Sequence, residues 1–162
     1  MKRTVFVSEP TGLSGEQRRT SGSWHQRLSG LGFDVLRLGR DEYEPDPWRI
    51  VLDFVDAADG VLVLGFRQLV IDSAVWRADT AERADVTGES WTSPWLQIET
   101  GMALAAGLPV LVAAEADVRE GVFARDTWTG QLAGTSLEAP CPAIVGRWAS
   151  TITARARRSL AS

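Results

Sequence analysis

The segment from Ser93 to Gly101 (Ser-Pro-Trp-Leu-Gln-Ile-Glu-Thr-Gly) is the part of the sequence best suited to chemistry. Ser93 followed by Pro94 predicts the start of a helix, because serine caps helices and proline favours the first helical position. Glu99 then falls in the second turn, near the positive end of the helix dipole, which favours its ionised form. The first backbone amides and Ser93 can receive a hydroxyl or a phosphate of a ligand. An ionised glutamate beside an anchored sugar is suited to attack or stabilise an oxocarbenium-like anomeric carbon. On spacing alone, a glutamate here is more often a solvated helix residue, so both interpretations stand.

Further candidates follow the predicted strands, since ligands of an open parallel sheet bind at the carboxyl ends of its strands. The loop after the central apolar run starts at Gly65, and Arg67 and Gln68 can bind a phosphate or a base edge; a solvated loop is the alternative for both. Ser8 ends the first strand, where a ligand would pass. Capping or turn formation is an equally good explanation for this serine. Asp59, at a helix end, is a candidate for orienting a ribose or the catalytic carboxylate, although such aspartates are often surface residues.

The seven tryptophans divide into two groups. Three recur at helical spacing with other apolar residues and are predicted to be core: Trp24, Trp48 and Trp148. The other group is better placed to stack on a base and to wall a ligand site: Trp76, Trp91 and Trp95.

Apolar runs alternate with amphipathic stretches along the chain, which is typical of βα repeats. Strands are predicted at Thr4–Ser8, Asp34–Leu38, Val61–Leu64 and Pro109–Ala113, with a short one near Thr135–Glu138. Helices are predicted to begin near Ser14, which can form a capping box with Gln17, at Asp46–Pro47, at Ser93 and from Ala143 onwards. The expected fold is one α/β domain over residues 1–162: three layers around a doubly wound, mainly parallel sheet of about five strands, flavodoxin- or Rossmann-like.

Residues 65–92 do not fit this alternation. They combine Trp76 and Trp91 with many charges and contain no clear strand, although Ser73 to Ala84 could form a short helix. Long connections inside a compact domain are usually lids or disordered segments. We expect a partly ordered lid.

Composition excludes several classes of function. The net charge is −4 and no basic block precedes the last turns, so nucleic-acid binding lacks its electrostatic footprint. No apolar run approaches the roughly 20 residues that span a bilayer, and the N-terminal run is too short for a signal peptide. Cys141 is the only cysteine, so no disulfide within the chain is predicted. His25 is the only histidine and is expected at the surface. With one cysteine and one histidine, no metal site is predicted. We expect a cytoplasmic protein without a cofactor.

The Ser93–Glu99 segment, with Gly101-Met102-Ala103 and then Gly107-Leu108-Pro109-Val110-Leu111-Val112, resembles the nucleoside 2-deoxyribosyltransferase-like superfamily. The passage from Asp56 to Leu64 resembles the helix-to-central-strand passage of the same group, and the likeness covers roughly residues 50–113. The Ser-x-Trp-x-x-x-Glu spacing also resembles the catalytic helix of TIR domains, some of which cleave NAD at the nicotinamide glycosidic bond. In both families the glutamate is the catalytic residue, and it matches Glu99. Trp95 stands where many transferases have a glycine, and residues 65–92 have no counterpart.

The resemblance implies an enzyme that cleaves or exchanges an N-glycosidic bond in a nucleoside, nucleotide or NAD-like substrate. Hydrolysis and transfer to an acceptor base both remain open, as do the sugar and the base. The alternative is a non-catalytic module that binds a nucleotide-derived signal or a partner protein through the same cleft. A third interpretation is an assembly subunit, for example of a homo-oligomer, whose exposed tryptophans anchor an interface.

Overall fold

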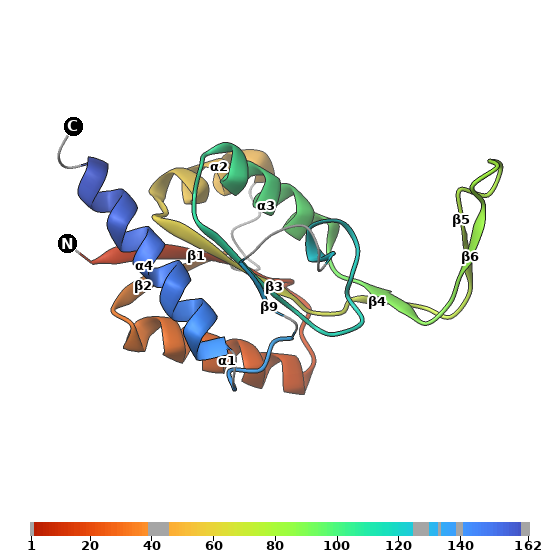
Figure 1. Cartoon of the computed structure of the whole chain (residues 1–162), viewed down its shortest axis with the longest axis horizontal. Helices are drawn as coiled ribbons and strands as arrows, with labels where there is room; N and C mark the ends of the chain where they lie inside the picture. The colour runs from red at the N-terminus through yellow and green to blue at the C-terminus, as the bar shows by residue number, and fades with distance from the viewer. Residues whose placement is uncertain (1, 39–45, 125–129, 133, 139–140, 160–162) are drawn as a thin grey trace.

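A five-stranded parallel sheet forms the centre of the computed structural model, which describes residues 2–38, 46–124, 130–132, 134–138 and 141–159. The strand order is β2-β1-β3-β8-β9, and every pairing is parallel (Figure 1). The strands are β1 (Arg3–Ser8), β2 (Phe33–Arg37), β3 (Gly60–Gly65), β8 (Val110–Ala114) and β9 (Gln131–Leu132). This order is that of flavodoxin-like folds, and it confirms the predicted doubly wound α/β domain.

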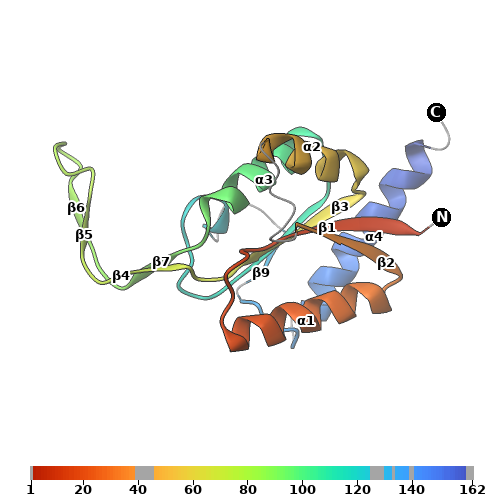
Figure 2. The same ribbon diagram turned by 180° about the vertical axis from the view of Figure 1, so that it is seen from behind.

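Helices cover both faces of the sheet. α1 (Gly15–Gly30) and α4 (Cys141–Ser159) lie on one face, and α2 (Pro47–Ala57) and α3 (Pro94–Ala105) lie on the other (Figures 1 and 2). Strand residues alternate between the two resulting cores, as the period of two in a strand requires: Val5 and Val7 pack with α1 and α4, and Phe6 packs with α2 and α3. None of the helices in the described part of the chain is long and apolar enough to cross a membrane.

The helix starts follow the local signals in the sequence. Ser14 and Gln17 form the capping box at the start of α1, Asp46 accepts the Arg49 N–H at the start of α2, and Ser93 caps α3. Each cap satisfies backbone N–H groups that have no partner inside the helix. The predicted starts of these three helices are confirmed.

Residues 69–91 form an arm, and the predicted absence of strands here is wrong. β4 (Leu69–Ile71) pairs antiparallel with β7 (Glu89–Trp91), and β5 (Ala74–Trp76) pairs antiparallel with β6 (Ala84–Val86). No helix forms between Ser73 and Ala84; Arg77, with a positive φ, turns the chain there, and the Arg77–Glu82 ion pair bridges the turn. The arm extends away from the sheet instead of folding over it as a lid (Figures 1 and 2).

Two smaller predictions are also wrong. Trp48 is 51% exposed, because the buried stripe of α2 runs through Val51 and Val55, while Trp24 and Trp148 are core residues as predicted. The fifth strand is β9, and residues 134–138 form no strand in the described part of the chain.

Candidate active site

The fold brings Ser8, at the end of β1, against Glu99 of α3. The Ser8 hydroxyl donates a short hydrogen bond to Glu99 Oε2, joining two residues 91 positions apart. Both side chains are buried, with exposed fractions of 1% for Ser8 and 3% for Glu99. The chain places β2 on one side of β1 and β3 on the other, so the carboxyl end of β1 is the topological switch point where α/β sheets bind ligands.

The burial of Glu99 changes its electrostatics. Burial raises the pKa of the Glu99 carboxyl from 4.5 to about 7, and the hydrogen bond from Ser8 opposes part of this rise. The helix dipole predicted an ionised side chain unless the cleft is dry enough to oppose it. The loss of hydration outweighs that contribution here, so the protonated and ionised forms coexist near neutral pH.

We expect Ser8→Ala to raise the pKa of Glu99 further. The substitution removes the hydrogen bond that stabilises the carboxylate and leaves the desolvation in place. NMR titration of the labelled glutamate side chains would measure the shift. Ser23→Ala is the matched control, because the Ser23 hydroxyl lies on the exposed side of α1 and bonds only locally, to the Arg19 carbonyl. A Glu99 pKa that is unchanged or lower in Ser8→Ala would contradict the assigned role of Ser8.

A network of side chains ties the neighbouring loops together. Gln17 Nε2 donates to both Glu115 oxygens, at 3.3 and 3.2 Å, and the Arg67 backbone N–H donates to Glu115 Oε2 at 2.6 Å. The Arg67 guanidinium pairs with Asp117 at 2.9 Å. Sequence reasoning missed Gln17, Glu115 and Asp117; their only signal was that the two acidic residues follow a predicted strand.

Arg67 and Gln68 lie at the expected edge, but their side chains already have partners in the protein. Gln68 Nε2 donates to the Gly12 carbonyl at 3.0 Å, and Arg67 holds Asp117. The Arg67 side chain is still 48% exposed. A ligand would therefore have to share or replace these contacts.

Gly65 has a structural explanation. A Cβ at this position would lie 2.6 Å from the Phe123 ring and 2.8 Å from the Ala114 Cβ, and the Gly65 carbonyl accepts the Glu115 N–H at 3.0 Å. The space beside Gly65 is filled by the protein itself, and close packing accounts for the glycine.

Gly65→Ala should accordingly destabilise the fold by about 1–3 kcal/mol, the usual effect of overpacking a core. Urea denaturation would measure the change in the free energy of unfolding. In the control Gly22→Ala, on the exposed side of α1, the new methyl group meets no neighbour within 4 Å, so the better helix propensity of alanine should stabilise the fold slightly. Equal effects of the two substitutions would show that Phe123 does not restrict Gly65.

The remaining candidates do not gather around Glu99 as one set. Asp59 lies at the amino ends of the strands, at the end of the sheet opposite to Ser8. Its carboxylate accepts the Thr4 N–H at 2.9 Å, at the start of β1, and pairs with Arg3. It is there because it precedes β3, whereas the site lies where the strands end. Ser93 caps α3 through a hydrogen bond from the Trp95 N–H at 3.3 Å.

The candidate tryptophans form two separate pairs. Trp95 lies one helical turn before Glu99, and its ring packs on Trp48 with centroids 5.1 Å apart. Trp91 packs against Trp76 of the arm, at 6.3 Å and an interplanar angle of 73°. Trp95 thus lies near the candidate site, and the other pair belongs to a different surface. Within the described ranges, no group of three His, Cys, Asp or Glu side chains could hold a metal ion.

No protein-family model and no curated protein matches this sequence. Among solved structures, a 2-deoxyribosyltransferase from the bacterium Bacillus psychrosaccharolyticus superposes with a TM-score of 0.51 at 15% identity, over 82% of this chain and 87% of the other. A 2-deoxyribosyltransferase from Leishmania mexicana gives 0.49 at 11% identity, over 91% and 97% of the two chains. A conserved protein from Enterococcus faecalis V583 gives 0.47 at 14%, over 96% and 99%. The first of these similarities shows a shared fold, which is the fold that the resemblance to the transferase-like superfamily implied.

Proposed function

We propose that this chain cleaves or exchanges the N-glycosidic bond of a nucleoside, nucleotide or NAD-like substrate, with Glu99 as nucleophile or stabiliser of the oxocarbenium-like centre. The observation that carries the proposal is the buried Glu99 carboxyl, hydrogen-bonded to Ser8 at the switch point of the sheet. A carboxyl group withheld from water at a ligand-binding edge, with a pKa brought near the working pH, is characteristic of functional sites. The fold shared with a 2-deoxyribosyltransferase adds support.

In this proposal the two oxygens of Glu99 have different tasks. Oε2 accepts the Ser8 hydrogen bond, which holds the carboxylate in one orientation. Oε1 is then the oxygen that approaches the anomeric carbon as the bond from that carbon to the base breaks and its electron pair leaves with the base. Water or a second base next attacks the same carbon and releases the Glu99 carboxylate. The attacking group loses a proton, which is taken up by the departed base or, where the base leaves neutral as nicotinamide does, passes to solvent. The first acceptor gives hydrolysis and the second gives transfer.

Incubation with NAD and a panel of ribo- and deoxyribonucleosides and their 5′-phosphates tests the proposal, with base release followed by chromatography. NAD belongs in the panel because of the TIR-like spacing of Ser93, Trp95 and Glu99. The wild type should release a base from at least one compound, and adding a second free base separates transfer from hydrolysis. No release from any compound would refute the enzymatic proposal.

A binding module is the second candidate, and one observation favours it. Glu99 is only 3% exposed and already engaged by Ser8, as expected for a structural carboxyl group in a site that binds without turnover. Ligand-induced thermal stabilisation with no product formed would identify this case. The stabilisation should then disappear in Arg67→Ala and persist in Glu99→Gln.

A further inference from the structure

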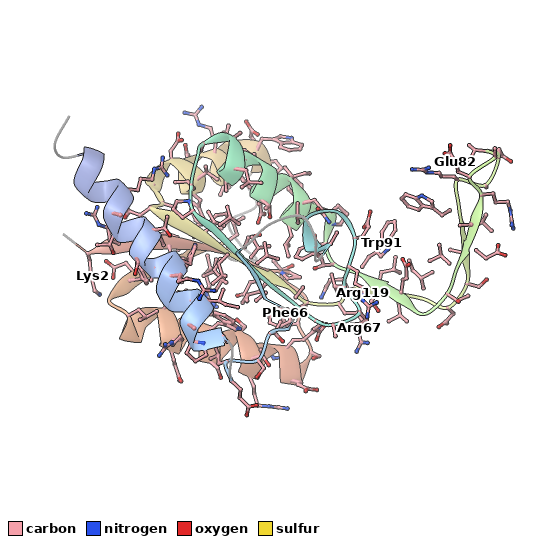
Figure 3. The ribbon with its side chains drawn as sticks, in the orientation of Figure 1. Lys2, Phe66, Arg67, Glu82, Trp91 and Arg119 are labelled. Carbon is pink, nitrogen blue, oxygen red and sulfur yellow. The ribbon has the colours of Figure 1, made fainter. Side chains whose placement is uncertain are left out.

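The arm, including its outer hairpin β5–β6, and the loop after β8 line an open groove that the proposed function does not use. The groove has a volume of about 490 Å³, within the range of small-molecule sites. It is lined by Trp76, Ala84, Asp85, Val86, Glu89, Trp91, Arg119, Glu120 and Gly121. Trp91 and Arg119 lie between the body of the domain and the arm, and Glu82 lies at the far end of the arm (Figure 3).

The arm side of the groove is anchored to the domain. The Ser90 N–H donates to the Asp117 carbonyl at 3.3 Å, and Ser90 forms a parallel bridge with Val118. The Gln68 N–H donates to the Trp91 carbonyl at 2.8 Å. These contacts hold Trp91 at a defined position beside the loop.

The loop side is braced by Gln97 of α3. Gln97 Nε2 donates to the Glu120 carbonyl at 3.0 Å, and Gln97 Oε1 accepts the Val122 N–H at 2.9 Å. Gly121 has a positive φ, and a Cβ there would lie 2.6 Å from Gln97 Oε1, so the close approach requires glycine. Trp91 and the loop wall are therefore held in place by contacts within the protein.

Aromatic rings and carboxylates characterise the lining. Trp76 and Trp91 meet edge to face, and Trp76 is 45% exposed. Glu89 and Glu120 are close enough to interact: burial and the charge of Glu89 both raise the pKa of Glu120. The third carboxylate, Asp85, is paired with Arg83 at 2.9 Å. The Trp91 indole N–H is buried and has no hydrogen-bond partner among the described residues.

We propose that this groove binds an organic cation, an ammonium or guanidinium group. A cation against the tryptophan rings gains cation–π attraction and relieves the repulsion between Glu89 and Glu120. A free anion is disfavoured, since the carboxylates of the lining outnumber its single cationic side chain, Arg119. The proposal is independent of the activity assigned to Glu99.

Calorimetric titration of the full chain with choline and with its neutral isostere, 3,3-dimethylbutan-1-ol, tests the charge requirement. Choline should bind at least about tenfold more tightly, because the two molecules have the same shape and only one can form the cation–π contact. No choline binding at tens of millimolar, or equal binding of the two compounds, would overturn the proposal.

Two variants locate the site. Trp76→Ala and Glu89→Gln should each weaken choline binding at least about threefold, the lower end of what one cation–π contact or charge is worth. The matched controls are Trp48→Ala, an exposed tryptophan that also packs on another tryptophan, and Glu82→Gln on the same arm outside the groove. Circular dichroism checks that the arm of Trp76→Ala stays folded. If the arm unfolds, the choline affinity of Glu89→Gln alone decides whether the cation binds in this groove. Equal losses in variants and controls would refute the assignment to this groove.

The same chemistry can come from a free molecule or from a protein side chain. Butylguanidine and an acetylated Gly-Arg-Gly amide each carry one guanidinium group as their only charge and separate these sources. Tighter binding of butylguanidine identifies a small-molecule site, and tighter binding of the peptide identifies a site for a partner's arginine. If neither binds while choline does, the site is restricted to ammonium groups.

Discussion

Glu99→Gln should lower turnover of any substrate found in the nucleotide panel by at least about a thousandfold. Glutamine keeps the size of the side chain and can still accept the Ser8 hydrogen bond, but its amide cannot attack the anomeric carbon or balance its positive charge. Glu16→Gln is the matched control, because it makes the same chemical change at an exposed position in the first turn of α1. Steady-state assays of both variants give the comparison.

The pH profile of the wild type provides an independent readout of the same group. Since the ionised form of Glu99 is the reactive one, kcat/KM should rise with pH up to about 7 and level off above it. The profile of Ser8→Ala should turn at a higher pH. A loss of less than about tenfold in Glu99→Gln would contradict a covalent role for Glu99.

Glu99→Gln should also make the protein more stable than wild type at alkaline pH. The folded state holds the Glu99 proton up to a pKa of about 7, whereas the unfolded chain releases it near 4.5. Between these values the folded state binds more protons than the unfolded state, so this group's contribution to stability is complete below about pH 4.5, decreases up to about pH 7 and is absent above it. The decrease amounts to about 3 kcal/mol, on the order of 1.4 kcal/mol for each pH unit.

Urea denaturation of wild type and Glu99→Gln at pH 4.5 and pH 8 isolates this contribution, because all other titrating groups are common to both proteins. The free energy of unfolding of the variant, relative to that of the wild type, should be about 2–3 kcal/mol higher at pH 8 than at pH 4.5. Glu16→Gln should show no such pH-dependent gain, since Glu16 is exposed. A constant difference between wild type and Glu99→Gln at both pH values would show that Glu99 is hydrated in the folded protein. A site whose charged group destabilises the fold is expected where function, and not stability, retains the residue.

Local signals predicted most of the sheet and its helices. The continuous run Val61–Leu64 indicated a strand covered on both faces, and β3 is buried throughout. Ser14, Asp46 and Ser93 marked three helix starts, because a cap acts through hydrogen bonds within a few residues. The position of Glu99 on the third of these helices followed directly.

The arm escaped prediction because its signals are weak. Its strands are three residues long and mostly exposed, so no apolar periodicity distinguishes them from a loop. Trp48 was misassigned for a related reason: helical spacing shows which residues share a side of the helix, but packing against the sheet decides how far the buried stripe extends.

By itself, then, the sequence determined the α/β repeat, the starts of its main helices and the position of Glu99 in the second turn of the helix that Ser93 caps, since all of these depend on neighbours within a few residues. Only the tertiary structure decided that Ser8 meets Glu99 across 91 residues, that this carboxyl is buried with a pKa near 7, and that Gly65 serves packing. It also placed Asp59 at the opposite edge and Trp91 beside Trp76. Such contacts join residues from different strands and helices, and burial depends on everything packed around a group, so neither can be read from local spacing.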